Sequence, residues 1–154
     1  MAYTAASIAN AFLSRSFRDK CPISPMKIQK LIYIFHGFSL VEFDEPVLDE
    51  VFEAWKFGPV LSSLYQEVKH VGSGSIENYL RDIDPETGAS SPAPIPDDQA
   101  LNEIIDFVWG NNKDRSAMDL SNWTHRKGAP WDQVTVGGAK IIRHKEVPND
   151  LIKK

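Results

Sequence analysis

The sequence predicts a single, mainly α-helical domain with a minor β element, and three observations lead to this fold class. One long stretch is apolar at helical spacing, several shorter segments repeat apolar residues in the same way, and a single stretch alternates as a strand does. The chain has 154 residues, enough for one domain that buries about 70% of the surface its unfolded form exposes. We therefore expect one compact helical domain over residues 1–154, with a small β-hairpin or extended arm.

The apolar stretch at residues 24–40 predicts a central helix. Ser24 is suited to accept a hydrogen bond from a first-turn N–H, and Pro25 has the φ angle of a first helical position. Large apolar side chains then recur at helical spacing and extend most of the way round, namely Ile28, Leu31, Ile32, Tyr33, Ile34, Phe35 and Phe38. A helix that is apolar on nearly every side has to be buried, so we expect the other elements to pack on it.

The segments on either side of this helix carry simpler signals. Thr4 is a suitable N-cap for an amphipathic first helix, which should reach about Phe17 and lie against the central one. Residues 47–57 mix apolar and acidic side chains in alternation, which favours the hairpin or extended arm. Gly58 permits an unusual turn after it, and Pro59 is expected to start another helix.

The second half of the chain is predicted from prolines, caps and glycines. Residues 84–96 carry four prolines and little that is apolar, which predicts an exposed loop. An aspartate at 97–98 should cap a helix that ends at Gly110, and Ser116 should open a shorter one. A turn is expected at the glycine pair 137–138.

The composition excludes several classes of protein. A formal net charge of −4 and a pI of about 5.5 argue against binding dominated by nucleic-acid phosphates, which needs clustered Lys and Arg. Cys21 is the only cysteine, so no intramolecular disulfide can form, and a reducing compartment, the cytoplasm, is expected. No apolar run approaches the ~20 residues that a membrane-spanning helix needs. We therefore expect a cytoplasmic protein without a membrane or nucleic-acid partner.

A catalytic site is hard to assemble from this sequence. The histidines at positions 36, 70, 125 and 144 show none of the spacings that place two metal ligands on one helix face. No phosphate-binding loop, dinucleotide-binding turn or nucleophile elbow is present, so neither a cofactor nor a metal is predicted. One enzymatic alternative remains, a hydrolase or nuclease that uses His125 with a carboxylate such as Glu53. It requires these two groups within hydrogen-bond reach.

His125 also has a structural interpretation. Thr124 and His125 stand shortly before Pro130 and Trp131, a spacing that could bring the imidazole beside the indole in a cleft. Alternatively, the imidazole ring hydrogen-bonds the backbone and thereby holds the turn at residues 128–131.

Two lysines and four tryptophans are candidates for contact with a partner. Lys27 and Lys30 lie one turn apart at the front of the central helix, where they form either a solvated rim over apolar surface or a small basic contact patch. Tryptophan is enriched at interface hot spots, although in a chain of this size most tryptophans belong to the core. Trp109 is expected in the core. The other three are Trp55, Trp123 and Trp131.

Three blocks of sequence occur in the order found in one known family. The blocks are Ser24-Pro-Met-Lys-Ile-Gln-Lys-Leu-Ile-Tyr33, Glu53-Ala-Trp-Lys-Phe-Gly-Pro-Val60 with Tyr65 after it, and Leu120-Ser-Asn-Trp-Thr-His125 with Pro130-Trp131. Together they resemble the Panacea domain, the SocA-like family that is also met as phage-associated GepA-like proteins. The resemblance spans about residues 4–131. Residues 132–154 are expected as a C-terminal tail packed on this domain.

The resemblance implies a mostly helical antitoxin that neutralises a partner toxin by protein contact, without a cofactor. An alternative is a phage or mobile-element adaptor that binds a host defence or regulatory protein. Family members often carry an acidic residue soon after the Thr-His pair, whereas Arg126 and Lys127 follow it here. The matching partner-binding candidates are Lys27, Lys30, Tyr33, Trp55, Tyr65, His125 and Trp131. The matching residues with an expected structural role are Ser24, Pro25, Gly58, Pro59 and Pro130.

Overall fold

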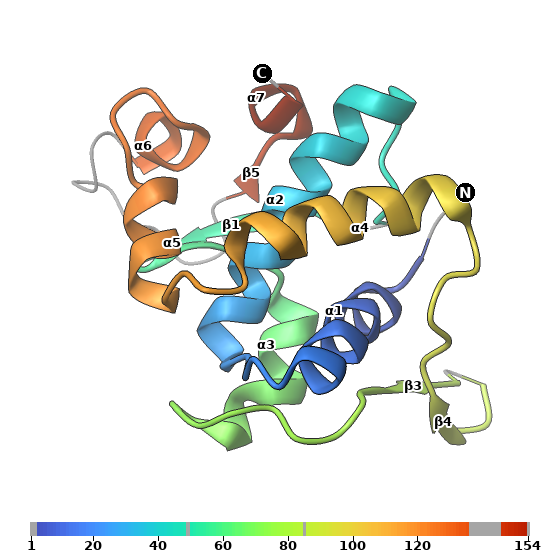
Figure 1. Cartoon of the computed structure of the whole chain (residues 1–154). Coiled ribbons are helices and arrows are strands. Elements are labelled where there is room, and N and C mark those ends of the chain that lie inside the picture. Colours follow the sequence, from blue (N-terminus) through green and yellow to red (C-terminus); the bar gives the residue numbers. More distant parts are fainter. Residues whose placement is uncertain (1–2, 49, 85, 136–145, 154) are drawn as a thin grey trace.

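Helices dominate the fold, which confirms the predicted class. The computed structural model describes residues 3–48, 50–84, 86–135 and 146–153. In chain order the elements are α1 (Ala5–Asp19), α2 (Pro25–Phe43), β1 (Phe52–Trp55), β2 (Gly58–Val60), α3 (Ser62–Val68), the short 3₁₀-helix η1 (Lys69–Val71), β3 (Arg81–Ile83), β4 (Ser90–Pro92), α4 (Gln99–Asn112), α5 (Ala117–Thr124), α6 (Pro130–Thr135), β5 (Glu146–Val147) and α7 (Asn149–Lys153) (Figure 1).

The helix α2 runs through the middle of the fold, as predicted (Figure 1). The Ser24 side chain caps it by accepting a hydrogen bond from the Lys27 N–H at 3.2 Å, and Pro25 occupies the first turn. It is in contact with α1, α3, α4, α5, α7 and β2, and its central apolar side chains are fully buried. The helix continues to Phe43, three residues beyond the predicted end, and stops where Asp44 adopts the left-handed conformation.

One side of α2 is more open than its apolar sequence predicts. Phe38 is 47% exposed and Val41 is 61% exposed, so the expectation of burial for Phe38 is wrong. The Phe38 ring meets the Phe107 ring of α4 edge to face, with the centroids 5.4 Å apart. Since Phe107 is itself 57% exposed, this pair lies on the surface.

The first helix begins where its cap predicts. The Thr4 hydroxyl accepts a hydrogen bond from the Ser7 N–H, and α1 runs two residues past Phe17 before Lys20 turns left-handed. Phe12 packs edge to face on Phe35 of α2, which places α1 against the central helix as expected.

The predicted hairpin is present, but its second strand replaces a predicted helix start. β1 pairs with β2 on one side, with Ala54 opposite Pro59, and with β5 on the other, so β2 is an edge strand. Pro59 therefore sits in a strand, and α3 starts only at Ser62, which corrects the expectation for Pro59. An edge strand tolerates the missing N–H of proline. Gly58 has φ +118°, which supports the predicted turn.

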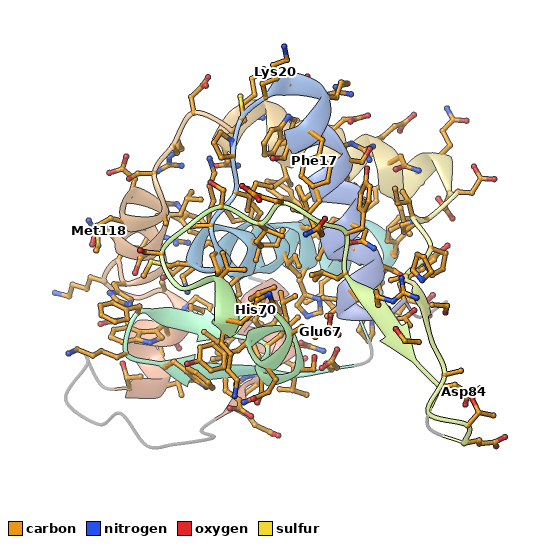
Figure 2. The ribbon with its side chains drawn as sticks, turned by 90° about the horizontal axis from the view of Figure 1, so that it is seen from below. Phe17, Lys20, Glu67, His70, Asp84 and Met118 are labelled. Carbon is orange, nitrogen blue, oxygen red and sulfur yellow. The ribbon has the colours of Figure 1, made fainter. Side chains whose placement is uncertain are left out.

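The proline-rich segment is less irregular than predicted. It contains β4, which pairs with β3 to form a second hairpin that projects from the helices, with Asp84 near its far end (Figure 2). The buried Asn10 side chain holds the base of this hairpin, because its amide donates to the Leu80 and Ala93 carbonyls and accepts from the Leu80 N–H. Most of the segment is exposed, whereas Ala93 is buried.

The C-terminal helices follow their predicted starts more closely than their ends. Asp98 caps α4 and Ser116 caps α5, as expected. Gly110 does not end α4, which continues to Asn112. The predicted turn at residues 137–138 lies outside the described residues. In the last segment, Ile152 of α7 is buried against α2.

None of the described helices combines the length and the apolar character needed to cross a lipid bilayer.

Candidate functional site

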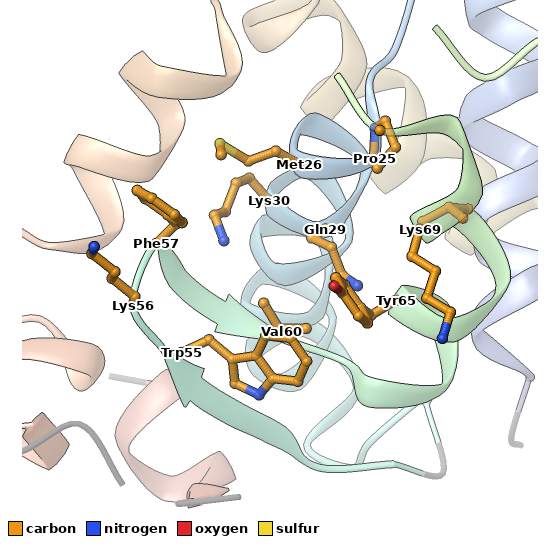
Figure 3. Close-up of a pocket in the computed structure, with 12 residues that line it drawn as sticks. Pro25, Met26, Gln29, Lys30, Trp55, Lys56, Phe57, Val60, Tyr65 and Lys69 are labelled. Atoms are coloured by element: carbon orange, nitrogen blue, oxygen red, sulfur yellow. The ribbon is translucent and has the colours of Figure 1, made fainter. Parts of the chain in front are cut away.

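A hollow of about 490 Å³ lies between the start of α2, the β1–β2 hairpin and α3 (Figure 3). Its walls combine aromatic and aliphatic side chains with lysines. Three aromatic residues line it, namely Trp55, Phe57 and Tyr65. Three lysines line it as well, namely Lys30, Lys56 and Lys69. Pockets of a few hundred Å³ with apolar walls and a few polar groups are typical of ligand or side-chain binding.

Two of the predicted contact residues meet in this hollow. The rings of Trp55 and Tyr65 lie 4.8 Å apart between centroids, and Tyr65 is 39% exposed. The indole N–H of Trp55 donates to Glu53 Oε1 at 2.9 Å, which orients the ring. Phe57, in the turn between the two strands, is 48% exposed. The hollow therefore presents accessible aromatic surface.

Lys30 reaches this hollow from inside the protein. Its side chain is 1% exposed, and its ammonium donates to the carbonyl of Pro59 at 3.1 Å. Burial lowers the pKa of Lys30 from 10.5 to about 7. The solvated rim is wrong for Lys30, because its side chain is buried. Contact between Lys30 and a partner stays a prediction. In Figure 3 the side chain extends from α2 toward the hairpin.

Gly58 makes the close approach of Lys30 possible. A Cβ atom at this position would lie 2.6 Å from Thr124 Oγ1 and 2.9 Å from Lys30 Nζ. Both distances are shorter than real side-chain contacts allow. A larger residue here would require the side chains of Thr124 and Lys30 to shift, and the positive φ is a second reason that favours glycine.

Lys27, one turn earlier, binds a different part of the molecule. It is also buried, at 6% exposure, and its ammonium donates to the Lys113 carbonyl at 2.5 Å. The same ammonium lies 5.9 Å from the centre of the Trp109 ring. Burial lowers the pKa of Lys27. Lys27 thus ties α2 to the end of α4 and does not line the hollow, and Trp109 is in the core as expected.

Three polar residues whose role was not predicted from the sequence hold the hairpin and the start of α3. Gln29 exchanges two hydrogen bonds with the backbone of Leu61, at 3.0 Å to the carbonyl and 2.9 Å from the N–H. Ser121 of α5 donates to the Phe57 carbonyl at 2.6 Å. Thr124 lies directly against Gly58. A polar residue on an apolar helix face, as at Gln29, was the available signal.

His125 and Trp131 lie on the α5–α6 side of the hairpin. Their rings stack with centroids 3.9 Å apart, and the Trp131 indole donates to the Trp55 carbonyl at 2.6 Å. The predicted pairing of imidazole and indole is therefore present. The predicted hydrogen bond from the ring to the backbone is not supported at Nε2, because this buried atom has no partner among the described residues. Burial and the charge of Lys30 lower the pKa of His125.

Tyr33 lies apart from the hollow. It is 5% exposed, its ring packs edge to face on Phe52, and burial raises its pKa to about 12. The structure thus gathers Lys30, Trp55 and Tyr65 at one place, with His125 and Trp131 supporting the hairpin. Pro130, for which a structural role is expected, is the first residue of α6.

The enzymatic alternative depends on His125 and Glu53. Glu53 accepts the indole N–H of Trp55, whereas His125 stacks on Trp131. Among the described residues, no group of three or more His, Cys, Asp or Glu side chains is placed to hold a metal ion. The two groups that the enzymatic alternative requires thus each contact a tryptophan side chain.

Comparison with known proteins gives two matches. The family model described as "Antitoxin SocA-like, Panacea domain" matches residues 28–132. The protein Antitoxin SocA of Caulobacter vibrioides (strain NA1000 / CB15N) is 35% identical over 133 residues, which cover 86% of this chain and 71% of that protein. No solved structure matches the chain. The matched range includes the hairpin and every residue that lines the hollow from β1 onward.

Proposed function

Because the chain belongs to the SocA-like, Panacea-domain family of antitoxins, we propose that it neutralises a partner toxin by direct, stoichiometric protein contact. The observation that carries this proposal is the aromatic hollow at the β1–β2 hairpin. Tryptophan and tyrosine are enriched among the residues that contribute most to protein interfaces, and such residues cluster in pockets from which water is excluded. We place the encounter with the toxin in the cytoplasm.

The rigidity of the hairpin supports a role as a binding surface. Three successive regions of its backbone are held by side chains from outside it, since the carbonyls of Trp55, Phe57 and Pro59 accept hydrogen bonds from Trp131, Ser121 and Lys30. A surface that is already ordered loses little conformational entropy on binding. Each large apolar side chain that the toxin buries there contributes about 1.5–3 kcal/mol.

Titration distinguishes contact from catalysis. The chain is mixed in increasing amounts with the toxin encoded by the neighbouring gene, and the remaining toxin activity is measured. Protection that rises linearly and saturates near an equimolar ratio is the expected result, because each antitoxin occupies one toxin. Protection by a small fraction of an equivalent that grows with incubation time would mean turnover and contradict the proposal, as would the lack of any protection.

A further inference from the structure

We infer that the hollow receives an acidic segment of the toxin, in which a large apolar side chain stands beside an aspartate or glutamate whose carboxylate binds Lys30. This inference rests on the proposed function, because it names the part of the toxin that the same site binds. Two features of the hollow lead to it, its aromatic walls and its set of positive charges.

The aromatic walls of the hollow are the reason for expecting a large apolar side chain in the bound segment. Trp55 and Tyr65 form one side, and Phe57 and Met26 stand across from them (Figure 3). A volume of about 490 Å³ falls within the usual range of roughly 300–1,000 Å³ for binding pockets. It is large enough for an aromatic or long aliphatic side chain together with a neighbouring residue. Such a side chain would cover the exposed edges of Tyr65 and Phe57.

The ammonium of Lys30 is the reason for expecting a carboxylate in the bound segment. An ammonium group has three N–H donors, and that of Lys30 makes one hydrogen bond within the described residues, to the Pro59 carbonyl. A buried cation without a counter-charge is unfavourable, and a carboxylate that approaches it forms a short, charge-assisted hydrogen bond. Because burial already lowers the pKa of Lys30, a carboxylate next to it would favour the protonated form again.

The rim of the hollow favours an acidic segment over a single terminal carboxylate. Lys56 and Lys69 are exposed there, with the Lys56 ammonium 5.5 Å from the centre of the Phe57 ring. No aspartate or glutamate is among the described residues that line the hollow. The chain as a whole has a net charge of −4, so this concentration of lysines is local. The exposed Lys56 and Lys69, together with the buried Lys30, can engage several carboxylates, which a segment rich in acidic side chains supplies.

The first test compares two buried lysines on the same helix. Lys30→Met keeps the aliphatic stem but removes the ammonium, and Lys27→Met does the same one turn earlier, outside the hollow. Affinity for the purified toxin is measured by calorimetry for both variants, after thermal unfolding has confirmed that each is folded. We expect Lys30→Met to weaken binding about 30-fold or more and Lys27→Met to leave it within about threefold. Equal affinities of Lys30→Met and the unchanged protein would overturn the inference.

A second test relies on an exposed position, where folding is not at risk. Phe57 is replaced by Glu or by Lys, two side chains of opposite charge at the mouth of the hollow. Against an acidic segment, Phe57→Glu should weaken binding at least about tenfold more than Phe57→Lys, with the difference shrinking as salt is added. Equal losses, or a greater loss for Phe57→Lys, would contradict an acidic occupant.

Photo-crosslinking then identifies the occupant directly. A photoreactive phenylalanine analogue at Tyr65 is crosslinked to the toxin, and the joined toxin peptide is identified by mass spectrometry. A peptide with an acidic residue beside a large apolar one supports the inference, and a peptide without acidic residues overturns it. If the unchanged protein fails to neutralise the toxin at all, the proposed function fails and this inference with it. If the unchanged protein neutralises the toxin but the Lys30→Met variant binds the toxin with the same affinity, only this inference fails.

Discussion

The two halves of α2 differ in how their side chains are used. In residues 25–33, the polar side chains Lys27, Gln29 and Lys30 are buried and hydrogen-bonded to backbone groups of other elements. In residues 34–43, Phe38 and Val41 are exposed instead. The comparison teaches that apolar character alone does not tell which part of a helix is covered. The candidate hollow lies beside the half of the helix whose polar side chains bind the backbone of other elements.

Substitutions in the apolar core, to which both halves of α2 contribute, should have the largest effect on stability. Leu31 and Phe35 are fully buried, one in each half. Replacing either by alanine should lower the free energy of unfolding by about 2–5 kcal/mol, because contacts are lost and a cavity remains. Chemical denaturation measures this change. A loss below about 1 kcal/mol for both variants would mean that α2 is not the centre of the fold.

The difference between the halves should appear when buried polar side chains are removed. Gln29→Ala leaves the N–H and the carbonyl of Leu61 without their partner, which costs about 1–3 kcal/mol for each buried group. The matched control in the second half is Ser39→Ala, because the Ser39 hydroxyl donates to the His36 carbonyl of the same helix and not to another element of the described chain. Denaturation curves of the two variants should differ clearly. Similar losses would remove the distinction between the halves.

Gly58 tests whether the hairpin is held as closely as the geometry indicates. Gly58→Ala forces a positive φ on alanine and a clash with Thr124 and Lys30, so we expect a loss of about 1–3 kcal/mol and weaker toxin binding. Gly128→Ala is the control, since φ there is also positive but a Cβ would meet nothing within 4 Å. Gly128→Ala should lower the free energy of unfolding by less than Gly58→Ala does and should leave toxin binding unchanged. Equal effects in melting and binding assays would contradict the close fit at Gly58.

The pH dependence of stability should distinguish the two halves of α2, because each half contains a buried titratable group that acts over its own pH range. Burial lowers the pKa of Lys30 to about 7 and also lowers the pKa of His36, whose Nε2 lies 2.9 Å from Asn149 Oδ1. In both cases the unfolded chain binds more protons, so stability rises with pH. For Lys30 the rise runs from about pH 7 to 10.5, and for His36 it lies below about pH 6.5.

For each group, the free energy of unfolding changes by at most about 1.4 kcal/mol per pH unit. Lys30→Met should flatten only the alkaline range, and His36→Gln only the acidic one. His125, whose pKa is also lowered, contributes in the same direction as His36, so His125→Gln is measured alongside. Unfolding free energies between pH 5 and 10 give both slopes. An unchanged alkaline slope in Lys30→Met would contradict the burial of this ammonium.

Helix starts with a side-chain cap were predictable from the sequence, whereas the start of α3 and the ends of helices were not. Thr4, Ser24, Asp98 and Ser116 cap the helices that they were expected to cap, because a cap depends on a side chain and a backbone group three residues away. Ends depend on tertiary packing, so α4 continues through Gly110. Proline can begin a helix or occupy an edge strand, and the pairing of β1 with both β2 and β5 decided between them for Pro59.

The candidate site was predictable in two of its aromatic residues but not in its supports. Trp55 stands out by residue type, since tryptophan is characteristic of interfaces, and Tyr65 was a candidate through the family resemblance. Phe57, which also lines the hollow, was not predicted. Gln29 and Ser121 bind backbone groups 32 and 64 residues away, and a backbone carbonyl has no signature in the sequence. The burial of Lys30 has the same origin, because its partner is the carbonyl of Pro59.

Hydrogen exchange with and without the toxin tests the central claim most directly, because it compares both faces of α2 in one experiment. The account predicts that bound toxin slows exchange in residues 55–69 and at the start of α2, where the hollow lies. Exchange around Phe38, Val41 and Phe107 should stay unchanged, although these side chains are exposed and apolar. Protection confined to this second face, with none at the hairpin, would contradict the account.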